Sequence, residues 1–382
     1  MTVVDPSPQQ DRPPAEVPDD EPVSLLAADG ARRPDERWDG WLLDVDDAAL
    51  RSLHRDLVLA RRLDDVATAL QRQGELGLWS PSRGQEAAQV GAGRALEEHD
   101  FAFPSYREHA LALVRGVDPV GLLGLFRGTT LGGWDPAVHR FGLYTIVVGS
   151  QALHAVGWAM GVRLDGEDAA VLACFGDGAT SQGDVHEACV WAASYTAPVV
   201  LLCQNNQWAI SEPLERQTKV PLARRAVGYG MPGVRVDGDD VLAVLAVCRA
   251  ALARARAGQG PTFVEAVTYR AGPHTTSDDP SRYRDPAEER VWAARDPLVR
   301  SERHLRQSGA ADDEWFARLT AEADALADDV RRRVRALGDP PLERLGQHVL
   351  APADDGGSAD PQLRRALAQH VADLGAEQGE DV

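Results

Sequence analysis

The sequence predicts an α/β fold built on a doubly wound, mostly parallel sheet that is flanked by helices. Two short apolar runs, residues 170–175 and 199–203, have the length and composition of buried strands, and an amphipathic helical pattern separates them. Further along, residues 233–237 and 261–269 have strand composition and enclose a helical pattern at 239–257. Such alternation of strands and helices is typical of a doubly wound sheet.

Composition divides the chain into three parts. Residues 1–37 are rich in proline and acidic residues, which predicts a disordered tail outside the fold. We expect residues 38–350 to form a single α/β domain, which is long enough for a large core. Residues 351–382 are predicted to be an acidic carboxyl-terminal tail in which one amphipathic helix could dock on a partner.

Charge and composition argue against several classes of partner. The 382 residues carry a formal net charge of −19, which disfavours nucleic acid and anionic membrane surfaces. No apolar stretch reaches the length of a membrane span, and no basic then apolar signal begins the chain. The cysteines lack metal-like spacing, so we expect reduced core residues of a cytoplasmic protein: Cys174, Cys189, Cys203 and Cys248.

Local signals predict where the other elements begin. Asp46 or Asp47 should cap a long helix that ends near Gly74, and Ser82 should open the next helix through a capping box. An aspartate and a proline at residues 118–119 should start a third helix.

Later elements are predicted from composition and periodicity. The apolar run at residues 143–148 should form another strand. Residues 285–309 and 312–338 should form two terminal helices.

Polar side chains stand at the carboxyl ends of the two central strands. Asp177 follows the first strand and Asn206 the second, where open α/β sheets bind ligands. Their oxygens, with a backbone carbonyl just after Asn206, suit Mg²⁺, whose coordination is usually completed by phosphate oxygens. Gly176 and Gly178 let the backbone approach a phosphate, and the following helix amino terminus favours an anion. These residues therefore predict a metal-bridged diphosphate.

Two other phosphate motifs do not fit. The dinucleotide fingerprint needs a glycine where Ser181 stands. A Walker-type loop needs Gly-Lys-Ser/Thr, but the one lysine of the chain, Lys219, follows a threonine.

The motif GDGATSQGD…HEA…NNQWAIS, within residues 176–211, resembles the α subunit of the first, decarboxylating component of 2-oxo acid dehydrogenase complexes. A bare GDG is an ordinary turn, but GDG with NN about two dozen residues later is the thiamine-diphosphate signature. RRLDDVATALQRQGELG, GQEAAQVG and DPLVRSERHLRQSG also resemble this family, so the likeness covers residues 50–340. The resemblance implies a thiamine-diphosphate-binding fold with extra helices at both ends.

The resemblance also implies roles for individual residues. Asp177, Asn206 and the carbonyl of Trp208 would hold Mg²⁺, and a backbone ligand tolerates tryptophan where the family usually has tyrosine. His274 would be the catalytic residue that faces the thiazolium. The residues that would contact thiamine diphosphate are Tyr106, Arg107, Ile146, Val148, Asp177, Gly178, Ala179, Asn206, Arg270 and His274.

The residues alone leave simpler interpretations open. Tyr106 and Arg107 could form a surface turn with an ion pair to Glu108, or a phenol and a guanidinium that grip a diphosphate. Val148 could be an ordinary core residue. The loop at residues 270–279 could be held by local side-chain-to-backbone bonds, or it could supply an arginine to phosphate and a histidine to proton transfer.

The resemblance implies an enzyme that works only with a partner. Thiamine chemistry needs a carboxylate against the pyrimidine ring, and no segment here offers an obvious one. In the family a glutamate of a separate β subunit does this, which implies an α₂β₂ heterotetramer. The enzyme would oxidatively decarboxylate a small 2-oxo acid and pass the acyl group to the lipoyl arm of the acyltransferase component.

The substrate is predicted only as a class. TSQGD and AGPHT resemble the pyruvate enzymes of Gram-positive bacteria, whereas HTTSDD resembles the branched-chain enzymes, so pyruvate and a branched-chain 2-oxo acid are equally expected. The alternatives are an acetoin dehydrogenase α subunit, a non-catalytic cofactor-binding scaffold and a nucleotide-binding dehydrogenase. Ser181 argues against the last of these.

Overall fold

The computed structural model describes residues 18–130, 132–340, 365–366, 368–370 and 372–373. In this part of the chain, five parallel strands form one sheet with the order β1-β2-β3-β7-β6, which confirms the predicted fold class. A short antiparallel ribbon, β4-β5, stands apart from it. The strands are β1 (Phe101–Phe103), β2 (Val171–Gly176), β3 (Val199–Asn205), β4 (Trp208–Ala209), β5 (Glu212–Pro213), β6 (Gly233–Asp237) and β7 (Thr262–Val267).

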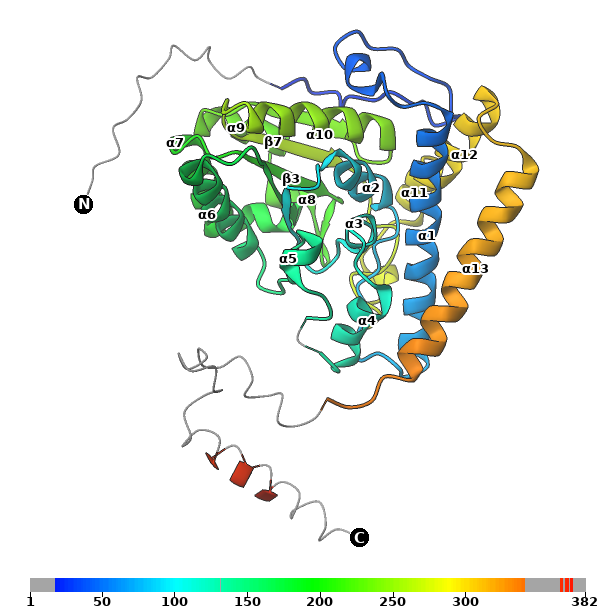
Figure 1. The fold of residues 1–382 in the computed structure, drawn as a ribbon. Helices are drawn as coiled ribbons and strands as arrows, with labels where there is room; N and C mark the ends of the chain where they lie inside the picture. Colours follow the sequence, from blue (N-terminus) through cyan, green and yellow to red (C-terminus); the bar gives the residue numbers. More distant parts are fainter. Residues whose placement is uncertain (1–17, 131, 341–364, 367, 371, 374–382) are drawn as a thin grey trace.

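Helices cover both faces of the sheet, and α1 and α13 lie side by side in an outer layer (Figure 1). The helices are α1 (Asp47–Arg72), α2 (Glu86–Ala95), α3 (His109–Val114), α4 (Pro119–Arg127), α5 (Pro136–His139), α6 (Ser150–Asp165), α7 (Gly183–Ser194), α8 (Leu214–Gln217), α9 (Arg225–Tyr229), α10 (Val241–Arg256), α11 (Pro286–Ala293), α12 (Pro297–Ser308) and α13 (Asp313–Arg335).

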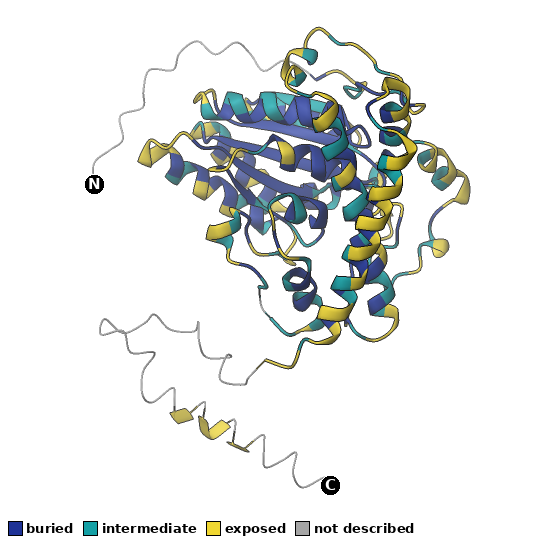
Figure 2. Cartoon of the chain, turned by 45° about the vertical axis from the view of Figure 1, so that its right-hand side comes forward, coloured by how far each residue is buried: buried dark blue, intermediate teal, exposed yellow. Residues whose placement is uncertain are grey.

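Alternate residues of the central strands β2 and β3 belong to different cores. Leu172 and Cys174 of β2 pack in a core shared with α1, α2 and α10, whereas Val171 and Ala173 pack in a second core shared with α6 and α7. The central strands are therefore buried on both sides, as the dark interior of Figure 2 shows. All four cysteines are free and buried, as predicted.

The strand order reverses between β3 and β7. From β1 to β3 each strand is added beside the previous one, but β6 lies at the far edge and β7 returns to lie beside β3. Open α/β sheets bind ligands at the carboxyl ends of their strands where the order reverses. The segments that follow β2, β3 and β7 meet at this edge.

Two predicted helix starts are confirmed and one is wrong. Asp46 caps α1 by accepting a hydrogen bond from the backbone of Ala49 at 2.8 Å, and α4 begins after residue 118 as expected. The capping box at Ser82 does not form, because α2 begins after Gln85. Gln85, the reciprocal residue of that box, accepts at its Oε1 from Nδ2 of Asn206 at 2.8 Å, while the backbone N–H of Ser82 donates to Oδ1 of Asp64 at 3.0 Å.

The predicted strand at residues 143–148 is also wrong. This run forms a loop, and its neighbour Phe141 makes an isolated bridge to Ala102 of β1. Tyr144 turns inward instead, and its hydroxyl lies 2.9 Å from Nδ1 of His109. The apolar composition of the run therefore reflects an exposed surface rather than a buried strand, since Ile146 is 68% exposed.

Residues 285–340 form three α-helices, one more than predicted. The segment 285–309 is divided into α11 and α12, because Pro297 lacks a backbone N–H and Asp296 caps a new helix through bonds to the backbone of Leu298 and Val299. The helix predicted at 312–338 is confirmed as α13.

The amino-terminal segment differs from the expected disordered tail over residues 18–37. The backbone N–H groups of Leu25 and Leu26 both donate to Oδ2 of Asp240 at 2.6 Å, and both leucines are buried. Val23 bridges to Val236 on the edge strand β6. Arg300 of α12 adds bonds to the carbonyl of Ala27 and the hydroxyl of Ser24, so this segment is anchored to both β6 and α12. The predicted tail at residues 1–17 lies outside the described residues.

The predicted tail at residues 351–382 lies mostly outside the described residues, and its described positions are helical and exposed. None of the helices in the described ranges has the length and apolarity needed to cross a membrane.

Candidate cofactor site

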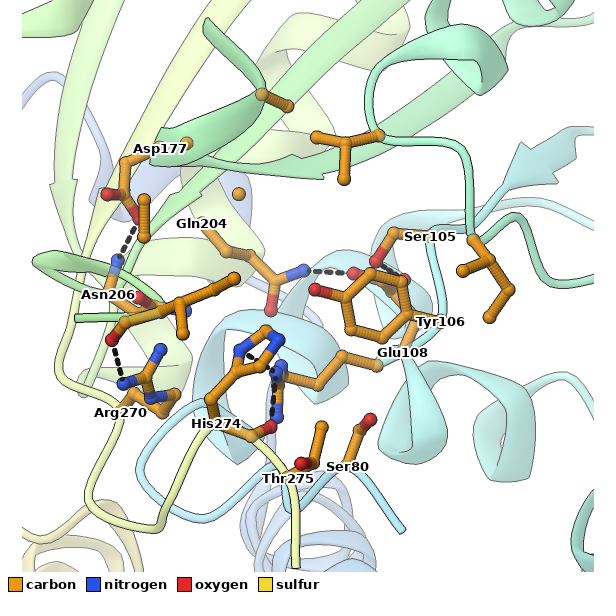
Figure 3. Close-up of a pocket in the computed structure, with 18 of the residues that line it drawn as sticks. Ser80, Ser105, Tyr106, Glu108, Asp177, Gln204, Asn206, Arg270, His274 and Thr275 are labelled. Carbon is orange, nitrogen blue, oxygen red and sulfur yellow. Dashed lines mark hydrogen bonds between the residues drawn. The ribbon is translucent and has the colours of Figure 1, made fainter. Parts of the chain in front are cut away.

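A cavity of about 450 Å³ opens where the segments after β2, β3 and β7 meet (Figure 3). Its wall contains every residue predicted for the site: Tyr106, Arg107, Ile146, Val148, Asp177, Gly178, Ala179, Asn206, Trp208, Arg270 and His274. These residues come from segments far apart in the sequence, so the fold brings the predicted set together.

The predicted metal ligands form a hydrogen-bonded group at one end of the cavity. Asp177 begins a 3₁₀ turn directly after β2, and its Oδ1 accepts a bond from the backbone of Asn206 at 3.3 Å. Its Oδ2 accepts from Nε2 of Gln217 at 3.0 Å. Oδ1 of Asn206 accepts from the backbone of Trp208 at 3.2 Å. A carboxylate, an amide oxygen and a nearby carbonyl are the hard donors that Mg²⁺ prefers.

The electrostatics of Asp177 suit a bound cation. Burial raises its pKa above the ordinary value, while hydrogen bonds from Gln217 and the backbone oppose this increase. A divalent cation beside the carboxylate would favour its charged form. Among the described residues no three His, Cys, Asp or Glu side chains converge on a metal position, and the predicted ligand set contains only one such side chain.

Gly178 is required by a close approach of two segments. A Cβ built on it would lie 2.9 Å from Cβ of Ala209, which is closer than real side chains pack. The turn after β2 can therefore lie against the segment after β3 only without a side chain at this position.

Arg270 holds the segment that carries the third predicted ligand. It is 1% exposed, and its guanidinium donates to the carbonyl oxygens of Trp208 at 3.3 Å and Ile210 at 2.7 Å. Burial lowers the pKa of Arg270 to about 10, with further lowering from Arg284 and Arg107, so the group keeps its charge at neutral pH. A carbonyl oxygen has two lone pairs, so Trp208 can accept this bond and still offer a lone pair to a metal.

Arg107 fixes the position of His274. Its guanidinium donates to the carbonyl of Pro81 at 2.5 Å and to that of His274 at 2.9 Å, and one nitrogen lies 3.2 Å from the imidazole Nδ1. Asp278 holds the same loop by accepting from the backbone of His274 at 2.8 Å. The surface-turn interpretation of Arg107 is wrong, because the side chain is buried and bonds to a distant loop.

The imidazole of His274 is neutral. Burial lowers its pKa to about 4, and the positive charges of Arg107 and Arg270 add to the effect. Because a guanidinium can only donate, the 3.2 Å contact makes Nδ1 an acceptor and leaves the proton on Nε2. The ring lies within the cavity, with Tyr106 at its edge (Figure 3). His274 can therefore donate a hydrogen bond to a carbonyl oxygen.

Several cavity residues were missed by the sequence analysis. Glu108 accepts from Ser105 and from Nε2 of Gln204, both at 2.7 Å, and this buried network supports the turn that carries Tyr106. Burial raises the pKa of Glu108. Gln204 was not counted among the predicted site residues.

Some buried polar atoms of the cavity wall have no hydrogen-bond partner. They are Nε2 of Gln85, Oε1 of Gln151, Nε1 of Trp208 and Nε of Arg270. Buried polar groups in proteins are nearly always satisfied, so such atoms indicate a place where a polar ligand or water belongs. Their chemistry, mostly donors beside a carboxylate and an amide, fits a metal-bridged anion.

The opposite end of the cavity is apolar and open. Ile146 and Val148 lie on the loop before α6 and are 68% and 43% exposed. The core interpretation of Val148 is therefore wrong. Leu143 and Val147 on the same loop are also exposed.

The chain is similar to proteins of one family over most of its length. The family model described as dehydrogenase E1 component matches residues 54–343. A 3-methyl-2-oxobutanoate dehydrogenase subunit alpha of Mycobacterium tuberculosis is 47% identical over 355 residues, which cover 91% of this chain and 95% of that protein.

Two other relatives bear a different name. A pyruvate dehydrogenase E1 component subunit alpha of Acholeplasma laidlawii is 37% identical and covers 84% of this chain and 92% of its own length. One of Staphylococcus epidermidis, with the same name, is 39% identical and covers 80% and 85%.

Proposed function

Because this chain belongs to the dehydrogenase E1 component family, we propose that it is the α subunit of a 2-oxo acid dehydrogenase that acts on a branched-chain 2-oxo acid. The observation that supports this most strongly is the convergence of Asp177, Asn206, Arg270 and His274 on one cavity. A scaffold without activity would have no need for this combination. We also propose that the protein is cytoplasmic. The four free cysteines support this location.

The buried end of the cavity would hold the diphosphate and metal part of thiamine diphosphate. Asp177, Asn206 and the carbonyl of Trp208 would hold Mg²⁺, while Tyr106, Arg107 and Arg270 would face the phosphates and Gly178 and Ala179 would contact them through the backbone. When bound, thiamine diphosphate supplies the nucleophilic carbon and the electron sink for decarboxylation. The chain contributes binding and orientation.

His274 is the residue that would act on the substrate. Its neutral imidazole, with the proton on Nε2, can donate to the oxygen of a 2-oxo group, and Arg107 keeps the ring in that orientation. Positioned hydrogen bonds of this kind stabilise charge that develops on oxygen during reaction.

The open end of the cavity would be closed by a β subunit. Ile146 and Val148 would support the pyrimidine end of the cofactor, yet they are exposed. A β subunit placed there would bury these apolar side chains and bring the carboxylate that the chain does not supply. We propose an α₂β₂ heterotetramer that passes the acyl group to the lipoyl arm of an acyltransferase.

The substrate preference is argued from the relatives. The similarity to the 3-methyl-2-oxobutanoate dehydrogenase subunit, at 47% identity, exceeds the 37% and 39% to the two pyruvate dehydrogenase subunits. We therefore expect a branched-chain acid to be preferred over pyruvate, although sequence analysis gave the two equal weight.

The test is decarboxylation by the co-purified α and β subunits, with thiamine diphosphate, Mg²⁺ and an artificial electron acceptor. We expect the highest kcat/KM with 3-methyl-2-oxobutanoate, a lower value with pyruvate and a negligible one with acetoin. The isolated α chain should have no activity. Preference for pyruvate or acetoin would contradict the proposed substrate, and turnover by the α chain alone would contradict the need for β.

A further inference from the structure

Gln85 is held beside the candidate metal ligands by a tightly packed turn. The preceding residue, Gly84, has φ +91°, and a Cβ on it would lie 2.1 Å from the carbonyl oxygen of Tyr269. Only glycine permits this approach. The turn is further fixed by the bond from the backbone of Ala271 to the carbonyl of Arg83, at 3.0 Å. Gln85 is therefore anchored to the end of β7, next to the end of β3.

The side chain of Gln85 does not cap its own helix. As N-cap of α2 it makes no side-chain capping bond. Its Oε1 instead accepts from Nδ2 of Asn206 at 2.8 Å, while Oδ1 of Asn206 accepts from the backbone of Trp208. These two bonds fix the orientation of the Asn206 side-chain amide, and therefore the positions of Oδ1 and Nδ2. Without Gln85, the Asn206 amide could rotate and present its NH₂ group instead.

The NH₂ group of the Gln85 side chain makes no hydrogen bond. The residue is 1% exposed and lines the cavity, yet Nε2 has no hydrogen-bond partner. Gln89, one turn along α2, makes a useful contrast because its Nε2 donates to the carbonyl of Arg107 and to Oε1 of Gln204, at 3.0 and 3.1 Å. A buried N–H₂ group needs an acceptor, and phosphate oxygens are strong acceptors.

We propose that Gln85 is a positioning residue for the metal and a direct hydrogen-bond donor to the bound diphosphate. Its amide oxygen keeps Oδ1 of Asn206 available to the metal, and its amide nitrogen donates to a phosphate oxygen. This inference rests on the proposed function, because it assumes that a diphosphate and a divalent metal occupy the cavity. It adds a residue that the motif-based site did not contain.

The inference is tested by titrating the apo α₂β₂ complex with thiamine diphosphate at increasing Mg²⁺ concentrations, and following tryptophan fluorescence or calorimetric heat. Gln85→Leu removes both functions of the amide. We expect its dissociation constant at saturating Mg²⁺ to rise by about tenfold or more, the effect of losing one hydrogen bond to a charged group. The half-saturating Mg²⁺ concentration should also rise, which a general loosening of the fold would not require.

Two further variants separate the alternatives. Gln85→Glu keeps an acceptor for Asn206 but replaces the donor with a negative charge, so it too should bind the diphosphate at least about tenfold more weakly. If Gln85→Leu does not fold, the affinity of Gln85→Glu for thiamine diphosphate tests the donor role instead. Gln259→Leu is the matched control: Gln259 is exposed and does not line the cavity, so affinity should stay within about twofold.

The outcomes distinguish this inference from the proposed function. If the unmodified complex does not bind thiamine diphosphate, the proposed function itself fails. If it binds and folded Gln85→Leu binds equally well, the role of Gln85 is overturned. If only Gln85→Glu retains full affinity, the donor role is overturned and orientation of Asn206 alone remains.

Discussion

The two ends of the cavity are built in opposite ways. At the end with the candidate metal ligands, called the metal end below, Asp177, Asn206 and Arg270 are between 1% and 7% exposed, and all follow strands of the central sheet. At the other end, Ile146 and Val148 lie on a loop that pairs with no strand, and they are 68% and 43% exposed. Residues at buried strand ends are held rigidly by the layers around them, whereas the residues of this loop form part of the protein surface.

This difference indicates how the work is divided. A wall whose side chains are bonded to one another is pre-organised, so little ordering is needed when a ligand binds. An exposed apolar wall has the opposite property, because it gains stability only when something covers it. In the proposed function, the chain supplies the buried half of the site and a partner covers the exposed half. Substitutions at one end should therefore leave the other end unaffected.

The largest effect is expected from Asp177→Asn at the metal end. The carboxylate is the only charged oxygen donor of the predicted ligand set, and replacing it with an amide removes the charge that attracts the cation. Activity of the α₂β₂ complex should fall by more than about 100-fold, because loss of an outer-sphere partner alone costs up to that amount. Decarboxylation assays and fluorescence titration with Mg²⁺ and thiamine diphosphate would measure it.

Glu167→Gln provides the matched control for this prediction. It removes one exposed carboxylate just after α6 that does not line the cavity. It should leave activity within about twofold. Association with β should be unaffected in both variants, so a loss of the tetramer in Asp177→Asn would show that the two ends are not independent.

An intermediate effect is expected from Ile146→Asp at the open end. The side chain is exposed in this chain, so the melting temperature of isolated α should change by no more than about 2 °C. Burying a carboxylate under β is unfavourable, so the α–β dissociation constant should rise by about tenfold or more. Calorimetric titration of α with β would measure the change.

Val138→Asp is the comparison variant for the open end. Val138 is 72% exposed on α5 and does not line the cavity. Its effect on association with β should be small. Equal weakening by both variants would mean that β does not cover the cavity end specifically.

The same contrast explains what the sequence predicted well. Buried parallel strands are continuous apolar runs, and β2, β3, β6 and β7 were all located from them. The residues directly after those strands were then placed correctly, since the strand ends determine their position. The positions of Asp177 and Asn206 could therefore be predicted without knowing how the loops fold.

Predictions failed where an apolar run had another cause. The run around Ile146 was predicted to be a strand because a sequence does not distinguish apolar residues that will be exposed from those that will be buried. Only tertiary contacts distinguish them. Leu25 and Leu26 were lost within a proline-rich tail because two residues carry little periodicity. Gln85 was missed because its importance comes from one bond to Asn206 across 121 positions.

The smallest expected effect concerns His274, which lies between the two ends. Burial and the charges of Arg107 and Arg270 lower its pKa to about 4 in the folded state, against about 6.5 in the unfolded chain. Between these values the unfolded state binds more protons, so stability rises with pH and is lost as pH falls from about 6.5 towards 4. Burial also lowers the pKa of His54 to about 4 and that of His109 to about 3, which adds to the same trend.

Replacing His274 with alanine removes only its own share of this pH dependence. Between pH 7 and pH 5, the melting temperature of the isolated chain should fall less in His274→Ala than in the unmodified chain, by about 1–3 °C for one partly exposed group. Differential scanning calorimetry at matched ionic strength would measure it. Because the arginines that depress this pKa belong to the buried wall, parallel curves for the two proteins would mean that this wall does not control the protonation of His274.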